Sequence, residues 1–129
     1  MIYLDTSVAI AHLLGEDRHP AAGLWQQSLV ASRLLEYELF VRLHARRLTK
    51  SHGDAAQQLV ARVAMLELSA PVLARALDPF PVELRTLDAL HLASLEFLRN
   101  QGVDVALASY DARMLAAARA LDIPVASFE

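Results

Sequence analysis

The chain has 129 residues, 55% of them hydrophobic, and a formal net charge of −3 at pH 7. This length predicts a single domain over residues 1–129 with a substantial core. The acidic balance argues against a nucleic-acid binder held by bulk charge attraction, and the absence of cysteine excludes disulfides and thiolate metal sites. No apolar run approaches the roughly 18 residues of a membrane span, and the N-terminus does not resemble a secretory signal, so we expect a cytoplasmic protein without membrane contact.

Strands and helices are expected to alternate through the first half of the chain. The expected elements are a strand at 2–4, a helix at 6–14, a helix at 19–27, a strand at 29–31, a helix at 32–49 and, after a turn at 51–54, a helix at 54–65. Asp54 is the expected cap of the last of these helices.

The second half continues the alternation. The expected elements are a weak strand at 66–69, a short helix at 70–78, an apolar helix at 86–100, a strand at 103–109, a helix at 111–121 and a final strand at 125–127. Strands that alternate with helices predict a three-layer α/β/α fold around a central parallel sheet of four to five strands.

Three aspartates stand where helices are expected to begin. Asp5 and Asp111 each follow a strand, so a parallel sheet would bring them to one edge, where open α/β sheets bind ligands. Asp88 lies in the most apolar helix, where its charge requires a partner or a cation. Each aspartate is also a suitable helix cap, because a carboxylate accepts the free N–H groups of a first turn. Capping and ion binding therefore both stay open for each residue taken singly.

Glu38 is distinguished from Glu36 by the helical pattern around it. Helical spacing predicts an inward-facing stripe at Leu34, Tyr37, Val41, Ala45 and Leu48. Glu38 falls beside this stripe and Glu36 points away from it, so we expect Glu38 to join the aspartates and Glu36 to lie on the surface. A second apolar strip, at Leu35, Leu39 and Leu43, is expected either to pack against the following helix or to meet a partner.

The four acids together suit a divalent cation. Carboxylates crowded into one cleft repel one another unless a cation neutralises them. Oxygen ligands without cysteine favour Mg²⁺ or Mn²⁺ over Zn²⁺. Such an ion keeps bound waters, activates one of them as a nucleophile, and neutralises charge on a phosphoryl oxygen. The reaction that fits is hydrolysis of a phosphodiester bond.

The basic residues and histidines give weaker evidence about function than the four acids do. Eleven of the twelve basic residues are arginine, which makes planar contacts with phosphate. Arg85 and Arg113 lie close in sequence to proposed ligands and are candidate phosphate contacts, although both also suit ordinary surface positions. His91 is one helical turn beyond Asp88, and we expect it to pack within the apolar helix rather than to bind metal.

The acids occur in the segments MIYLDTS, SRLLEYEL, LRTLDALHLASL and ALASYDARMLAAA. In order and spacing these segments resemble the four acidic blocks of the PIN domain, and most of all those of VapC-type toxins from bacterial toxin–antitoxin pairs. The resemblance covers essentially the whole chain. It implies a Mg²⁺- or Mn²⁺-dependent endoribonuclease with all four acids at the metal and the hydroxyl groups of Thr6 and Ser109 nearby.

The resemblance also implies an RNA substrate, a homodimer, and a VapB-like antitoxin whose tail lies across the helices between Ser32 and Met65. One alternative is a PIN-like interaction module that has lost its chemistry. Another is a phosphoryl-transfer enzyme of a different α/β family with Asp5 as a covalent nucleophile. Haloacid-dehalogenase-type phosphatases need a second aspartate where this chain has Ser7, and Lys50 comes too early to be the lysine that such enzymes and receiver domains require.

Overall fold

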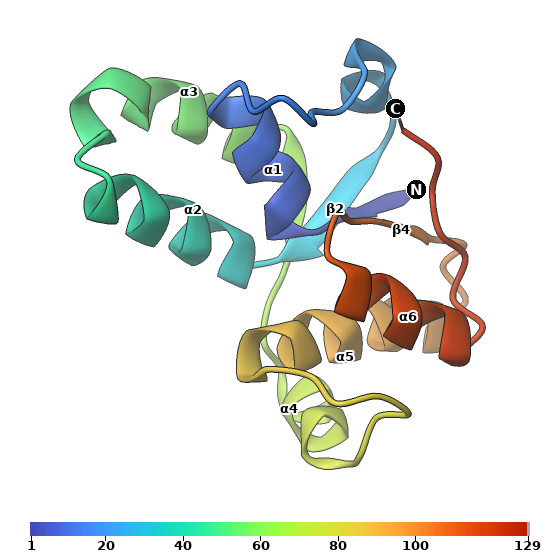
Figure 1. Ribbon diagram of the computed structural model, residues 1–129. Coiled ribbons are helices and arrows are strands. Elements are labelled where there is room, and N and C mark those ends of the chain that lie inside the picture. Colours follow the sequence, from blue (N-terminus) through green and yellow to red (C-terminus); the bar gives the residue numbers. More distant parts are fainter. Residues whose placement is uncertain (129) are drawn as a thin grey trace.

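The computed structural model describes residues 1–128 and contains a parallel sheet between two layers of helices (Figure 1). The strands are β1 (Ile2–Leu4), β2 (Leu29–Ser32), β3 (Val63–Leu66) and β4 (Ala106–Ala108). All pairings are parallel, in the order β3-β2-β1-β4, and Leu107 forms a further parallel bridge with Val125. The predicted three-layer fold with four to five parallel strands is confirmed.

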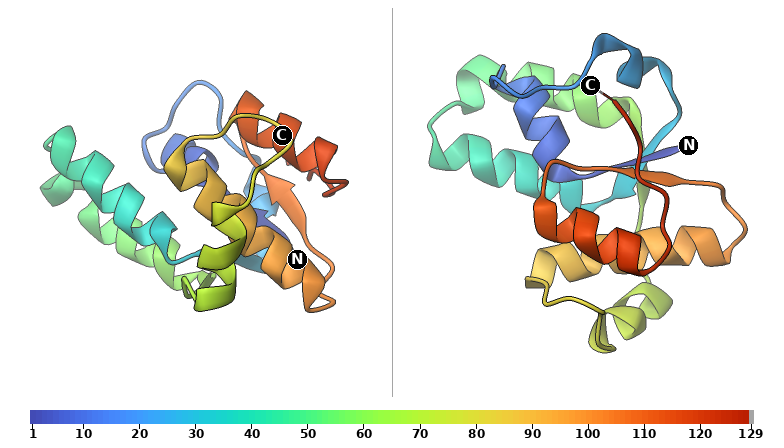
Figure 2. Two further views of the ribbon diagram at one scale, coloured as in Figure 1. Left: turned by 90° about the horizontal axis from the view of Figure 1, so that it is seen from below. Right: turned by 45° about the vertical axis from the view of Figure 1, so that its right-hand side comes forward.

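The helices lie on both faces of this sheet. They are α1 (Thr6–Leu13), the 3-10 helix η1 (Ala22–Gln26), α2 (Leu34–Ala45), α3 (Thr49–Ala61), α4 (Ala70–Leu77), α5 (Thr86–Asn100) and α6 (Ala112–Ala120). Helices α1, α2 and α3 cover one face, α5 and α6 cover the other, and α4 packs on the outside of α5 (Figures 1 and 2). Within residues 1–128, no helix combines the length and apolar character that a membrane crossing needs.

Each strand divides its side chains between two cores, because successive residues in a strand point to opposite faces. Ile2 and Leu4 pack with residues of α1, α2 and α3, whereas Tyr3 packs with residues of α5 and α6. All three are buried. The first strand is therefore enclosed on both faces, as parallel strands usually are.

The strand order creates a crevice beside β1. The chain moves from β1 outward to β2 and β3, and later returns to the other side of β1 as β4. Open α/β sheets bind ligands where the strand order reverses in this way, at the carboxyl ends of the strands. Leu4 pairs with Ala108, and the Asp5 N–H donates to the Ala108 carbonyl at 3.0 Å. The residues that follow β1 and β4 therefore start side by side.

The inward stripe predicted for α2 is wrong. The second strip, Leu35, Leu39 and Leu43, is at most 1% exposed, whereas Tyr37 and Val41 are 62% and 45% exposed. Leu35 and Leu39 join the core that also contains residues of α1 and α3, so the packing alternative for this strip is confirmed. Both strips are apolar at helical spacing, and only the sheet and α3 decide which of them faces inward.

Other differences are at element boundaries. Helix α3 begins at Thr49, so the predicted turn at 51–54 is helical and Asp54 is not its cap. Strand β3 lies at Val63–Leu66, earlier than predicted, the predicted helix at 19–27 is the shorter η1, and the predicted final strand is only the bridge at Val125. Buried Ala56, Leu59 and Val60 anchor α3 in the core, and such packing overrides the weak turn preferences of its first residues.

The corrected stripe can be tested by truncating one residue of each strip. Leu39→Ala is expected to lower the free energy of unfolding by about 2–5 kcal/mol, because it opens a cavity in a fully buried region. Tyr37→Ala is expected to change it by about 0.5 kcal/mol or less, because the side chain is mostly exposed. Urea denaturation of both variants measures the difference, and a larger loss for Tyr37→Ala would contradict the observed orientation of α2.

Candidate active site

A cavity of about 850 Å³ opens at the carboxyl edge of β1, and the four predicted acids all line it. Asp5 lies at the junction of β1 and α1, Glu38 lies on α2, Asp88 lies in the first turn of α5, and Asp111 precedes α6. The structure thus brings together four carboxylates that are widely separated along the chain.

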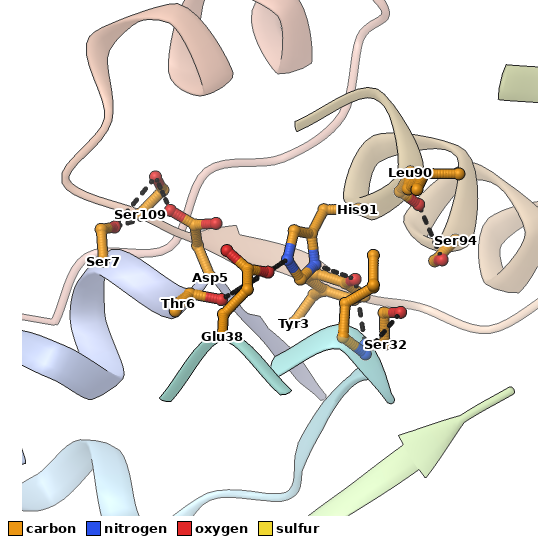
Figure 3. Close-up of polar contacts among 11 residues, drawn as sticks. Tyr3, Asp5, Thr6, Ser7, Ser32, Glu38, Leu90, His91, Ser94 and Ser109 are labelled. Carbon is orange, nitrogen blue, oxygen red and sulfur yellow. Dashed lines mark hydrogen bonds and ion pairs between the residues drawn. The ribbon is translucent and has the colours of Figure 1, made fainter. Parts of the chain in front are cut away.

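Asp5 is buried, with 4% of its surface exposed. It occupies the position before α1, but its side chain makes no capping hydrogen bond. Its Oδ2 atom instead accepts hydrogen bonds from the hydroxyl groups of Ser7, at 2.6 Å, and Ser109, at 2.8 Å (Figure 3). A buried carboxylate needs such donors to remain charged, so the capping interpretation does not hold for Asp5.

Ser7 and Ser109 also attach Asp5 to the loop after β4. The Tyr110 N–H donates to Ser7 Oγ at 3.0 Å, and the Asp111 N–H donates to Ser109 Oγ at 2.9 Å. Ser109 was expected near the site, whereas the role of Ser7 was missed. Its signal in the sequence was a hydroxyl residue two positions after Asp5.

Glu38 reaches the cavity from α2, and its side chain is 19% exposed. Its Oε1 atom accepts the Thr6 hydroxyl at 3.1 Å and contacts His91 Nε2 at 2.5 Å (Figure 3). Glu36 does not line this cavity. The two glutamates therefore differ in their access to the cavity, but Glu36, expected on the surface, is half-buried, and the stripe used to separate them was the wrong one.

His91 is buried, as expected, at 1% exposure, but its ring makes polar contacts that its apolar sequence context does not indicate. Besides Glu38, the ring contacts the Tyr3 hydroxyl through Nδ1 at 2.9 Å. Burial lowers the pKa of His91, and the hydrogen bond and charge of Glu38, with the charges of Asp5 and Asp88, outweigh this effect and raise it. Burial raises the pKa of Tyr3, so its phenol stays protonated.

Asp111 caps its helix, whereas Asp88 does not. Asp111 Oδ1 accepts the N–H groups of Arg113, at 2.8 Å, and Met114, at 3.3 Å, so this carboxylate does cap α6. Asp88 makes no capping hydrogen bond within residues 1–128. Burial, followed by the negative charges of Asp111, Asp5 and Glu38, raises the pKa of Asp88. The cavity therefore holds more negative charge than its own hydrogen bonds compensate.

The donor set fits a hard divalent cation. In the described part of the chain, no three acidic or histidine side chains are arranged to hold one ion directly. Mg²⁺ commonly takes only one or two protein carboxylates and keeps several waters, so carboxylates spaced around a cavity suit it. All four side chains offer oxygen, and their mutual repulsion favours a cation between them.

The two predicted arginines occupy different places. Arg85 lines the acidic cavity, together with Arg18 and Arg42. Arg113 does not line it, but borders a neighbouring groove of about 410 Å³ to which Arg85 also contributes. The apolar part of this groove is formed by Val82, Leu84, Ala112 and Ala116. Arg85 is thus shared between the acidic cavity and the groove.

The family model and the relatives that match this chain agree on one family. The family model described as PIN domain matches residues 2–120. Ribonuclease VapC46 of Mycobacterium tuberculosis is 34% identical over 128 residues, which cover 96% of this chain and 95% of the relative. Ribonuclease VapC47 of Mycobacterium tuberculosis is 30% identical over 134 residues, with 98% of this chain and 96% of the relative covered.

Two solved structures have a similar fold. A toxin–antitoxin complex from Klebsiella pneumoniae contains a chain that matches with a TM-score of 0.66 and 16% identity, covering 90% of this chain and 91% of that one. Mycobacterium tuberculosis VapC20, a sarcin–ricin loop cleaving toxin, matches with a TM-score of 0.66 and 24% identity, covering 91% of this chain and 95% of that one. At these identities the likeness supports the fold alone.

The burial of Asp88 and the crowding of the acids predict a stability effect in the protein without metal. Because the pKa of Asp88 is raised on folding, ionisation of this residue costs folding free energy as the pH rises. Asp88→Asn is therefore expected to raise the free energy of unfolding at neutral pH in EDTA. The gain should vanish as the pH falls through the pKa of Asp88, because the wild-type side chain is then neutral as well.

Urea denaturation at neutral and acidic pH measures this effect, with Asp104→Asn, at an exposed position, as the matched control. A loss of stability in Asp88→Asn at neutral pH would contradict a raised pKa of Asp88 and the burial and repulsion that cause it.

Proposed function

The chain belongs to the PIN domain family, and we propose that it is a divalent-metal-dependent endoribonuclease acting as the toxin of a VapC-type toxin–antitoxin pair. The observation that carries this proposal is the cavity at the carboxyl edge of β1, lined by Asp5, Glu38, Asp88 and Asp111. The names of the curated relatives supply the reaction class, since both are called ribonucleases.

We assign Mg²⁺ or Mn²⁺ to these four acids. When bound, the ion supplies an activated water and neutralises charge on the phosphoryl group. Asp5 meets its two hydroxyl donors through Oδ2, which leaves Oδ1 for the ion. Glu38 meets Thr6 and His91 through Oε1, which leaves Oε2. The hydroxyl and imidazole groups hold the carboxylates, and the carboxylates would hold the ion.

The arginines at the cavity provide the local positive charge that a chain of net charge −3 needs to bind RNA. Guanidinium groups pair with phosphate through two parallel hydrogen bonds. We propose that Arg85 contacts the phosphate at the cavity and that the strand continues into the groove bordered by Arg113. The apolar part of the groove suits the flat face of a base, which stacks without sequence preference.

The partners follow from the family. A VapC-type toxin has a cognate antitoxin, and one of the similar structures is a toxin–antitoxin complex. Tyr37 and Val41 expose apolar surface on α2, within the segment where the family places the antitoxin tail. A homodimer is part of the same proposal.

Metal-dependent cleavage of RNA tests the proposal. The purified chain is expected to fragment total RNA with Mg²⁺ or Mn²⁺ and to leave it intact with EDTA. Asp5→Asn and Glu38→Gln should lower the rate by more than about 100-fold, the upper range for groups that only orient a ligand. Denaturing gel electrophoresis of a time course measures these rates.

Glu36→Gln is the matched control on the same helix and is expected to stay within about twofold of the wild type, because Glu36 is half-buried but does not line the cavity and the substitution nearly preserves its shape. Equal cleavage by all variants would mean that the site is elsewhere. No cleavage by the wild type under any metal condition would favour the alternative of a PIN-like interaction module without chemistry.

The RNA path is tested by removing one guanidinium at a time. Arg85→Ala and Arg113→Ala are each expected to raise KM for a short single-stranded RNA and to reduce the slope of log KM against log salt by about one. Arg119→Ala, at the exposed end of α6, removes the same charge away from both cavities and should leave the slope unchanged. An equal change in all three variants would indicate bulk electrostatics rather than a defined path.

A further inference from the structure

Glu38 is held by a chain of hydrogen bonds that begins at the end of strand β2. The Ser32 backbone N–H donates to the Tyr3 hydroxyl at 3.0 Å, and this hydroxyl lies 2.9 Å from His91 Nδ1. The other ring nitrogen, Nε2, lies 2.5 Å from Glu38 Oε1 (Figure 3). The contacts connect β2, β1, α5 and α2 in sequence and end at the acidic cavity.

We propose that His91 and Tyr3 are positioning residues that orient the Glu38 carboxylate for metal binding, an inference that rests on the function proposed above. A glutamate on a partly exposed helix face otherwise samples several rotamers, and ordering it at the moment of metal binding costs free energy. A ligand already held by the protein does not incur this cost, which is why outer partners of metal ligands strongly affect affinity.

The donors and acceptors of the chain are matched at every step. Glu38 Oε1 is an acceptor, so His91 Nε2 carries a hydrogen and donates it, whether the ring is neutral or charged. The Tyr3 hydroxyl accepts the Ser32 N–H and has its own hydrogen to donate to Nδ1 of the neutral ring. The orientation of Glu38 therefore does not depend on a change in the charge of the ring.

The burial along the chain distinguishes positioning from a purely structural cluster. Tyr3 and His91 are 0% and 1% exposed, whereas the Glu38 side chain at the end of the chain is 19% exposed and lines the cavity. Buried polar groups in general add no stability over apolar side chains of the same shape. A cluster that served only the core would therefore be expected to pair its polar groups with one another inside the core. This one directs its final hydrogen bond at a carboxylate on the cavity wall.

Direct Mn²⁺ binding to the RNA-free protein tests the inference, measured by isothermal titration calorimetry. His91→Leu is expected to weaken the affinity by about 10–100-fold, because it removes one of the two donors to Glu38 Oε1 and leaves only the Thr6 hydroxyl. His91→Gln keeps an N–H group near the position of Nε2 and should restore most of this loss. Leu95→Ala truncates a buried apolar side chain on the same helix without removing any hydrogen bond of the chain, so it should lower Tm and leave the Mn²⁺ affinity unchanged.

Circular dichroism establishes that each variant is folded before titration. A folded His91→Leu protein that binds Mn²⁺ within about twofold of the wild type overturns the inference, as does an equal loss in His91→Leu and Leu95→Ala. If His91→Leu does not fold, Tyr3→Phe decides: an affinity at least about threefold weaker supports positioning, and an unchanged affinity overturns it.

Asp5→Asn separates this inference from the proposed function. If the wild type binds Mn²⁺ and Asp5→Asn does not, the metal site is supported. The His91 variants then test only whether His91 positions Glu38. If the wild type and Asp5→Asn behave alike, the metal site itself is wrong, and the inference about Glu38 is overturned with it.

Discussion

The parallel pairing of β1 with β4 is the constraint on which the rest of the site depends. Its register sets Leu4 opposite Ala108, so that the chain leaves both strands at the same level. Asp5 then lies within hydrogen-bonding distance of Ser109, and the loop that carries Asp111 is attached through backbone N–H groups to Ser7 and Ser109. A slip of one residue would reverse the facing of every side chain in the strand and separate these groups. The crevice beside β1 is therefore a product of strand order and register together.

Electrostatics explains why this crevice suits a cation. Asp5 and Glu38 each accept hydrogen bonds from hydroxyl or imidazole groups on one oxygen. No such donor to Asp88 is found within residues 1–128, and burial together with the charges of Asp111 and Asp5 raises the pKa of this residue. The protein thus holds negative charge that its own hydrogen bonds only partly offset. The contact between Glu38 and His91 also joins the helix layers on the two faces of the sheet. In this arrangement the same hydrogen bonds serve packing between layers and the orientation of a proposed metal ligand.

Much of the fold could be predicted from the sequence because its signals are local. The alternation of apolar runs indicated the parallel sheet, and the helix at 86–100 was placed at its observed bounds. The four acids were singled out because each stands at a strand end, a helix start or the flank of an apolar strip. The facing of α2 could not be predicted, because two apolar strips compete on that helix and the choice depends on α3 and the sheet. The contact of Tyr3 with His91 joins residues 88 positions apart, and no local pattern indicates such a pair.

By itself the sequence determined the order of the elements, the oxygen-only donor set and the family, since these depend on residue type and spacing along the chain. Tertiary structure alone decided which oxygen of each carboxylate is engaged, that Asp111 caps its helix while Asp5 does not, and that His91 reaches Glu38 across the sheet edge. The physical reason is that hydrogen-bond partners are chosen by distance in the folded chain. That distance follows from strand register and layer packing, which the sequence encodes only through the whole fold.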